Sequence, residues 1–149
     1  MTPQLTRLRL GLAAGAAALA TAGVLAASGA AQAGPTTMHL VAKAQTSASY
    51  FPKGRPRLGD RAGFGDKISG DDTGFARGAC TVTDKGMLCT IQVQLSKGTL
   101  SVQGLAPERS RNTPFAIIGG TGAYDGARGT VRATDINATT SDLAITLKP

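Results

Sequence analysis

An aspartate in the middle of an alternating apolar segment is the residue of this chain best suited to chemistry. Asp66 lies between Phe64 and Ile68, and the three share one face if the segment is a β-strand. If that face is the interior, the carboxylate must be paired or have a shifted pKa. The other polar residues that could join it at one site are Asp60, Tyr124, Asp125 and Arg128.

Three of these residues also have a purely structural interpretation. Asp60 follows a glycine and could cap the start of a strand through local backbone hydrogen bonds. Tyr124 could anchor a glycine-rich turn against the end of the fold. Arg128 could form a surface ion pair, which stabilises a protein very little. The sequence leaves both interpretations open.

Several kinds of active site lack the residues that they need. The chain has one histidine, His39, and no Gly-x-Ser-x-Gly motif, so a Ser/His/Asp nucleophile is not supported. One histidine and two cysteines are too few ligands for a metal centre. Residues 119–122 are glycine-rich but no helix follows them, so they do not predict a phosphate-binding loop. We expect no metal and no cofactor.

Apolar residues recur with the period of a β-strand along most of the chain. The alternation is clearest over residues 87–95, and no window predicts an amphipathic helix. Eight short antiparallel strands with tight turns between them indicate a closed barrel or a sandwich. The predicted strands are 38–44, 62–68, 77–83, 87–95, 99–105, 115–118, 127–134 and 143–147.

Four short motifs in a fixed order resemble one family. Gly59-Asp60 precedes Phe64 and Asp66, and Gly78-Ala79-Cys80, residues 98–104 and the glycine-rich residues 117–131 follow. In this order they resemble the allene oxide cyclase barrel and the dirigent-like proteins, over about residues 38–147. The resemblance implies an all-β fold, an eight-stranded antiparallel β-barrel of the calycin type, as a single domain over residues 34–149.

The resemblance also implies a chemistry. The enzymes of this family hold a reactive apolar molecule in a cavity while a carboxylate stabilises charge, which is catalysis by orientation. Asp66 and Arg128 fall in motifs that resemble the family's acidic and arginine elements, which implies catalytic roles, with Phe64 and Tyr124 as ligand-binding residues. The first-strand glutamate of allene oxide cyclases is missing from residues 40–44, which argues against allene oxide as the substrate.

Three functions remain open. The first is a secreted, isomerase-like enzyme that guides the cyclisation or stereoselective coupling of an apolar small molecule. The second is a non-catalytic barrel that binds such a molecule, and the third is an envelope-associated structural barrel. An eight-stranded barrel is either filled by its own side chains or wide enough for one small ligand, so the state of the interior separates the classes. An oligomer is compatible with each of them.

Cys80 and Cys89 are predicted to form a disulfide. With Asp84-Lys85 as a two-residue turn, the two cysteines lie directly opposite each other on one face of a hairpin. Oxidation is expected in an exported chain. The alternative is a free thiol, because the resembling plant cyclases carry a cysteine at the position of Cys80 without a partner for it.

Residues 1–33 are predicted to be a signal peptide. Arg7 and Arg9 precede an uncharged apolar run over residues 10–27, and Ala31-Gln32-Ala33 fits a signal-peptidase site. Cleavage after Ala33 would give a secreted, extracellular protein without a stable membrane span. The alternative is an uncleaved membrane anchor, since the run is near the minimum spanning length.

After this cleavage the chain would be basic. Residues 34–149 carry 14 Lys and Arg against nine Asp and Glu, a formal charge of +5. Six of these cations cluster between residues 43 and 67, and such a cluster could bind a polyanion. The interleaved aromatic residues that would stack on nucleic-acid bases are missing. A solvated loop is therefore the simpler interpretation. We expect a hydrophobic small molecule, not nucleic acid, as the partner. The clustered cations are Lys43, Lys53, Arg55, Arg57, Arg61 and Lys67.

Overall fold

The computed structural model of the protein describes residues 36–51 and 54–149. The predicted signal peptide over residues 1–33, its cleavage site after Ala33, and Lys53 of the basic cluster all lie outside the described residues. Within the described ranges, no helix is long and apolar enough to cross a membrane.

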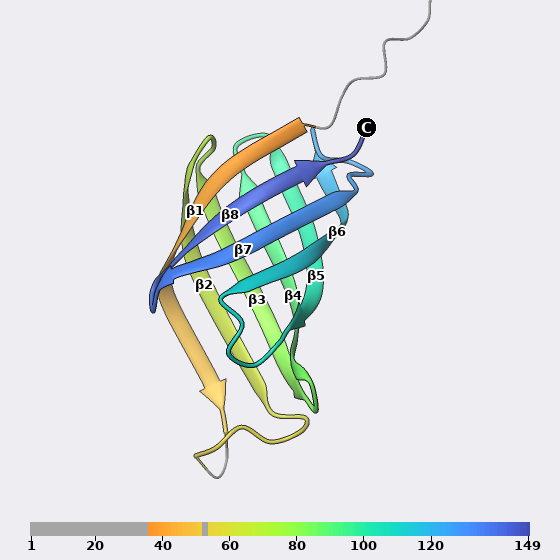
Figure 1. The fold of residues 1–149 in the computed structure, drawn as a ribbon. Coiled ribbons are helices and arrows are strands. Elements are labelled where there is room, and N and C mark those ends of the chain that lie inside the picture. Colours follow the sequence, from red (N-terminus) through yellow and green to blue (C-terminus); the bar gives the residue numbers. More distant parts are fainter. Residues whose placement is uncertain (1–35, 52–53) are drawn as a thin grey trace, which may run out of the picture. The chain divides into compact units, whose positions relative to one another are not determined.

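Eight antiparallel strands close into one barrel and follow one another around it in chain order (Figure 1). The first and last strands pair with each other and complete the ring. The predicted eight-stranded antiparallel barrel is therefore confirmed, and the sandwich is excluded. The strands are β1 (Thr36–Tyr50), β2 (Arg61–Gly70), β3 (Gly74–Thr83), β4 (Gly86–Leu95), β5 (Gly98–Ala106), β6 (Asn112–Gly122), β7 (Gly129–Asn137) and β8 (Thr140–Leu147).

Alternating side chains along each strand define the inside and the outside of the barrel. On β4, Cys89, Val93 and Leu95 are buried, whereas Thr90 and Gln92 between them are exposed. This is the period of two that the sequence predicts, because successive side chains of a strand point to opposite faces of the sheet. Parity along a strand therefore identifies the side chains that face the interior.

Large aliphatic side chains fill one end of the barrel. Leu40, Ile68, Leu100 and Ile145 come from four different strands, and each is at most 1% exposed. Burying a side chain of this size stabilises the fold by about 1.5–3 kcal/mol. The opposite end, toward the β3–β4 turn and the loop between β5 and β6, leaves space between its interior side chains. The barrel is thus packed at one end only.

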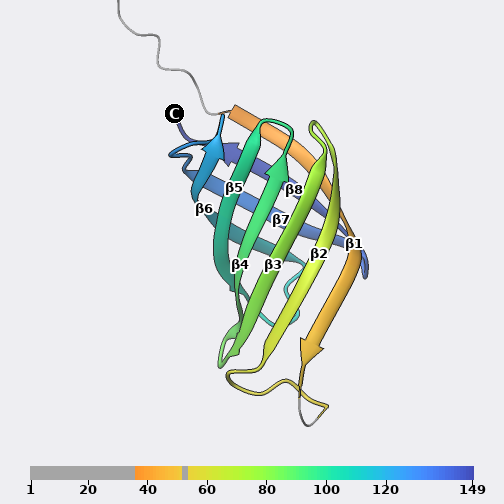
Figure 2. The ribbon, with the colours of Figure 1, turned by 180° about the vertical axis from the view of Figure 1, so that it is seen from behind.

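β1 is longer than predicted and leaves the barrel wall part-way along its length. It pairs with β8 only as far as Lys43. It stays paired with β2 to Tyr50, with a register shift between Ala44 and Thr46. Figure 2 shows the second half of β1 continuing beside β2 after it has left β8. The divergence opens the wall of the barrel beside the inner face of β2.

β6 continues through residues 119–122, where the sequence suggested a turn. These residues pair with residues 98–101 of β5, and the turn before β7 is confined to residues 123–128. A Cβ atom on Gly120 would lie 2.6 Å from the carbonyl oxygen of Thr99. It would also clash with the Tyr124 carbonyl oxygen of the following turn, so close approach of both the neighbouring strand and the turn explains this glycine.

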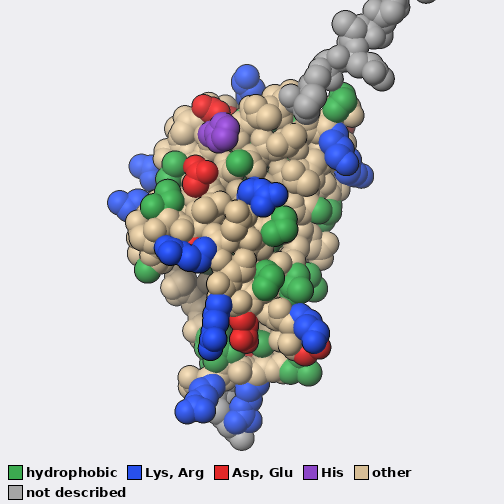
Figure 3. Space-filling view, viewed as in Figure 1, with side chains coloured by type: hydrophobic (Ala, Val, Ile, Leu, Met, Phe, Trp, Pro, Cys, Tyr) green, Lys and Arg blue, Asp and Glu red, His purple; other side chains and the backbone are tan. Residues whose placement is uncertain are grey.

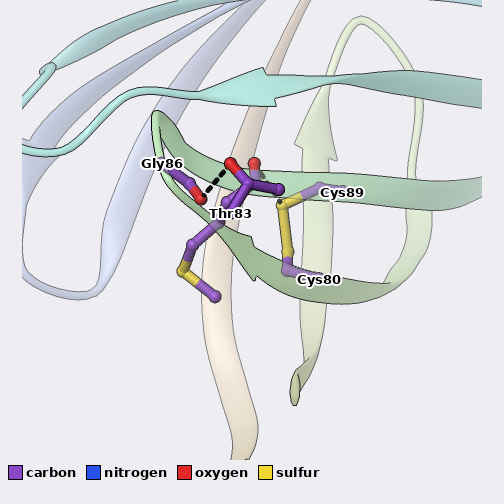
Figure 4. Close-up of a disulfide and its surroundings, with 5 residues drawn as sticks. Cys80, Thr83, Gly86 and Cys89 are labelled. Carbon is purple, nitrogen blue, oxygen red and sulfur yellow. Dashed lines mark hydrogen bonds between the residues drawn. A yellow bond between two sulfur atoms is a disulfide. The ribbon is translucent and has the colours of Figure 1, made fainter. Parts of the chain in front are cut away.

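The predicted disulfide joins Cys80 of β3 to Cys89 of β4. The two residues oppose each other in register, with an S–S distance of 2.06 Å and a Cα–Cα distance of 4.0 Å. At the turn of the same hairpin, the Thr83 hydroxyl donates a hydrogen bond of 2.8 Å to the Gly86 carbonyl oxygen (Figure 4). Neither cysteine is a free thiol, so the bridge ties the hairpin together beside its turn.

Removing the disulfide is expected to lower the stability of the barrel without unfolding it. The cysteines are separated by 9 positions, and in the chain-entropy model a loop of this size contributes about 2–3 kcal/mol. The double variant Cys80→Ala/Cys89→Ala should therefore melt about 10 °C lower in calorimetry. Wild-type protein reduced with dithiothreitol is the control, because it loses the bond but keeps both sulfur atoms. Equal melting temperatures for oxidised and reduced wild type would contradict this expectation.

Candidate functional site

An internal cavity occupies the less densely packed end of the barrel. Its volume is about 330 Å³, within the range of about 300–1,000 Å³ found for small-molecule sites. Space arises because four of the lining residues are alanines, one each on β1, β3, β5 and β7. These alanines are Ala42, Ala76, Ala106 and Ala133.

Two aromatic rings form opposite walls of this cavity. Phe64 lies on β2 and Phe115 on β6, half-way around the eight-stranded ring from each other. Each ring packs over a glycine of the neighbouring strand, Phe64 over Gly78 and Phe115 over Gly104, where any side chain would displace it. The cavity therefore offers an apolar, partly aromatic surface to a ligand.

The Asp66 carboxylate lines this cavity from β2. Its neighbours in register are Ala44 on β1 and Ala76 on β3, neither of which has a polar side chain. Burial raises the pKa of Asp66 above its ordinary value. Within the described part of the chain, the carboxylate has no hydrogen-bond or ion-pair partner. A partly desolvated carboxylate without a partner is available to a ligand.

Four further polar side chains line the cavity: Ser110 in the loop before β6, Thr113 on β6, Asp135 on β7 and Ser141 on β8. The Ser141 hydroxyl donates a hydrogen bond of 2.7 Å to the Asp135 carboxylate. Thr113 is only 7% exposed. Together with Asp66, these groups give the otherwise apolar cavity a few polar positions.

Arg128 lies outside the cavity. It borders a separate surface hollow of about 280 Å³ beside the β6–β7 turn, where Asp125 also lies. Its Nη1 atom donates hydrogen bonds of 2.9 Å to the carbonyl oxygens of Ile118 and Ala127. The guanidinium therefore holds the turn together, and the structure does not bring it near Asp66.

Tyr124 borders the same surface hollow as Arg128. Its hydroxyl lies 3.9 Å from the Met38 sulfur. Burial first, and the negative charge of Asp72 second, raise the pKa of the Tyr124 phenol. This contact with Met38 anchors the turn against the filled end of the barrel. Of the predicted site residues, the structure thus brings Phe64 and Asp66 together and places Tyr124 with Arg128 elsewhere.

The remaining candidate residues have local contacts. The Asp60 carboxylate accepts a hydrogen bond of 2.9 Å from the backbone N–H of Arg57, in the loop before β2. The backbone N–H of His39 donates one of 2.8 Å to the Asp71 carboxylate. No three His, Cys, Asp or Glu side chains gather into a metal-binding group in residues 36–51 and 54–149.

Basic side chains lie on the outside of the barrel. Figure 3, viewed as in Figure 1, shows Lys and Arg side chains scattered over the outer surface of the barrel and at the lower end of the picture, around the loop that follows β1. In that loop Arg55 and Arg57 are exposed, and Arg61 at the start of β2 is exposed as well. Among the described residues, no Lys, Arg or His lines the cavity.

Comparisons with known proteins identify the fold. No protein-family model matches the sequence, and a comparison with the curated proteins finds no match. Pyocyanin demethylase matches 76% of this chain and 100% of its own, at 28% identity and a TM-score of 0.66. AbnU, an exo-specific intermolecular Diels-Alderase, matches 77% of this chain and 98% of its own, at 15% identity and a TM-score of 0.61.

A dirigent protein completes the comparison. The pterocarpan synthase dirigent protein PsPTS1 matches 78% of this chain and 94% of its own, at 19% identity and a TM-score of 0.56. This chain has the barrel fold that these dirigent and cyclase proteins share. The likeness confirms the barrel fold that the resemblance of the four sequence motifs implied.

Four polar residues that line the cavity lie outside the predicted strands: Ser110, Thr113, Asp135 and Ser141. The predicted strand 127–134 ended one residue before Asp135, and the predicted strand 143–147 began two residues after Ser141. Parity could have found Asp135, because it continues the inward face of Val131 and Ala133. Thr113 and Pro114 fall between the predicted strands 99–105 and 115–118, but both are residues of β6.

Asp66 is expected to reduce the stability of the barrel at neutral pH. Because its folded pKa is raised above the unfolded value, the folded state binds protons more tightly, and stability falls as the pH rises through that window. Asp66→Asn should therefore melt higher than wild type at pH 7, and this advantage should shrink as the pH falls toward about 4, near the unfolded pKa, and be lost below it. Thermal melts of both proteins across about pH 3–8 measure this difference in melting temperature.

Asp72 provides the matched control for this expectation. Its pKa is lowered, chiefly by the backbone N–H of Thr73, so its contribution to stability is present above the unfolded pKa and is lost as the pH falls. Asp72→Asn should therefore melt lower than wild type at pH 7. If Asp66→Asn also melted lower, Asp66 would have a stabilising partner.

Proposed function

We propose that this protein binds an apolar small molecule in the barrel cavity and guides its cyclisation or stereoselective coupling. The observation that carries the proposal is the partly buried, unpartnered carboxylate of Asp66 in an apolar cavity of about 330 Å³. A buried carboxylate without a partner reduces stability, which is typical of a residue kept for function rather than for packing.

Orientation is the first contribution of the cavity. The rings of Phe64 and Phe115 on opposite walls hold a flexible apolar ligand in a folded conformation in which its reacting atoms are close together. Holding reacting atoms in this way replaces much of the entropy cost of the reaction. The packed end of the barrel, with Leu40 and Leu100, limits how deep the ligand goes.

Charge stabilisation is the second contribution. Where positive charge develops on the reacting carbons during ring closure or coupling, a fixed carboxylate in a water-poor cavity stabilises the transition state more than the bound ligand. Asp66 provides this charge without transferring a proton. Asp135, whose carboxylate already accepts a hydrogen bond from Ser141, is less available for the same role.

The names of the similar structures support this class of function. AbnU is a Diels-Alderase, PsPTS1 is a pterocarpan synthase dirigent protein, and pyocyanin demethylase is named for pyocyanin. All three names denote chemistry on a small molecule. The cavity of this chain would serve the same general purpose, with cyclisation or coupling as the reaction type.

Export of the protein is part of the proposal. The Cys80–Cys89 disulfide is typical of an oxidising compartment, and the predicted signal peptide over residues 1–33 supports the same conclusion. Intact mass spectrometry of the exported protein should give a chain that begins at Gly34 and lacks two hydrogens. A mature protein that retains residues 1–33 would contradict export by cleavage.

Native mass spectrometry of the protein purified from its source tests the proposed function. We expect a small molecule to co-purify with the folded barrel, and incubation of its unreacted form with the protein should give a cyclised or coupled product. A ligand that binds but is never converted would support a non-catalytic carrier instead. A folded protein that neither retains a small molecule nor binds an aromatic probe would contradict both.

A further inference from the structure

The charged side chains in the cavity carry one sign of charge. Asp66 and Asp135 both line it, and both also border an adjoining hollow of about 240 Å³ beside the β7–β8 turn. No Lys, Arg or His in the described ranges lines either space. The whole chain has a formal charge of +7, so the sign of the charge in this cavity is opposite to the net charge of the protein.

The two carboxylates flank the place where β1 leaves the barrel wall. Asp66 on β2 pairs with Ala44 of β1, and Asp135 on β7 pairs with Ser141 of β8. The last residue pair between β1 and β8 is Lys43 with Thr140. Asp66 and Asp135 thus stand on either side of the opening, three strand spacings of about 4.8 Å apart along the wall.

Hydroxyl groups also face this cavity. Thr113 is 7% exposed and lines the cavity from β6, and Ser110 lines it from the loop before β6. No buried side-chain nitrogen or oxygen of the described residues lacks a hydrogen-bond partner. The cavity therefore offers hydroxyls to a ligand with a polar group, but no unpaired buried atom requires one.

We propose that the ligand of this cavity is an amphipathic cation, whose apolar ring system fills the barrel and whose positively charged nitrogen lies between Asp66 and Asp135. This rests on the proposed function, because it concerns the ligand of the same cavity. The filled end of the barrel makes the apolar part enter first and leaves the charged part at the opening. Two carboxylates in a cavity that no described Lys, Arg or His lines favour a cation and repel an anion.

The basic side chains outside the cavity do not reverse this preference. Arg61 is the first residue of β2, and its side chain is exposed. Arg55 and Arg57 are exposed in the loop before β2. Exposed charges are screened by salt over about 8–10 Å. The Asp66 carboxylate is half-buried in the cavity wall and is screened less, whereas Asp135 is exposed at the edge of the cavity and is partly screened as well.

Fluorescence titrations with three aromatic probes of one size test the charge preference. The probes are 10-methylacridinium, a cation; 10-methylacridone, which is neutral; and anthracene-9-carboxylate, an anion. At pH 7 the wild-type protein should bind the cation about tenfold or more tightly than the neutral probe, and the anion most weakly. About tenfold is the effect of one favourable charge contact of moderate strength.

Variants of the two carboxylates show whether they cause the preference. Asp66→Asn and Asp135→Asn should each reduce the ratio of cation to neutral affinity several-fold while leaving the neutral affinity unchanged. Asp84→Asn, in the exposed β3–β4 turn, is the matched control and should retain the wild-type ratio. Circular dichroism checks that each variant is folded.

The outcomes separate this inference from the function on which it rests. Equal binding of the cationic and neutral probes, or tighter binding of the anion, would overturn the inference and leave the cavity as a ligand site. A preference for the cation that survives both carboxylate variants would overturn it as well. A folded wild-type protein that binds none of the probes would instead count against the proposed function itself.

Discussion

Replacing Asp66 with asparagine is expected to lower the turnover of the bound ligand about 100- to 1,000-fold, the typical effect of removing one electrostatic contact to a transition state. Asparagine keeps the size of the side chain and removes its charge. Affinity for a cationic ligand should fall at most about tenfold and affinity for a neutral one should not change, because the carboxylate acts mainly on charge that develops during reaction. Single-turnover rates and binding titrations with the co-purified ligand measure the two effects separately.

Asp60→Asn is the control for this experiment. Asp60 is also an aspartate near the start of β2, but its carboxylate accepts the backbone N–H of Arg57 and does not line the cavity. Its variant should turn over at the wild-type rate. Equal losses of rate and affinity in Asp66→Asn would show that Asp66 only binds the ligand. Wild-type rate and affinity would remove Asp66 from the site.

Much of the fold follows from period and turn chemistry. The alternation on β4 predicts which of its residues are buried, and the two-residue turn at Asp84-Lys85 fixes the register that brings Cys80 and Cys89 together. Both are local properties of a hairpin, so the sequence contains them directly. The whole of β1 could not be predicted, because its second half after Ala44 is small and polar and is held by pairing with β2 rather than by burial.

The predicted site residues on strands could likewise be placed from the sequence, whereas those in a turn could not. Asp66 and Phe64 follow from parity, since both continue the inward face that Ile68 begins. Arg128 and Tyr124 depend on how a turn folds back on itself, and the hydrogen bonds from Arg128 to the carbonyl oxygens of that turn cannot be read from neighbours in sequence. A candidate on a strand could therefore be placed from sequence, whereas one in a glycine-rich turn could not.

Filling the cavity is expected to abolish ligand binding and preserve the fold. Ala133 lies on β7 between Thr113 of β6 and Leu143 of β8, and it lines the cavity. In Ala133→Phe the added ring enters empty space rather than a close-packed region, so the destabilisation should stay at or below the low end of the usual overpacking range of about 1–3 kcal/mol. Affinity for 10-methylacridone should fall at least about 100-fold, because the ring occupies the volume that the probe needs.

Thr130→Phe separates steric blocking from a general effect of an added aromatic ring. Thr130 is on the same strand as Ala133 but exposed on its outer face, so its variant should bind the probe as wild type does. Melting temperature and circular dichroism show whether both variants are folded. If folded Ala133→Phe bound the probe as tightly as wild type, the ligand would lie outside the barrel. The surface hollow beside Tyr124 and Arg128 would then be the next candidate for the ligand site. Neither the cavity nor Asp66 would then take part in binding the ligand.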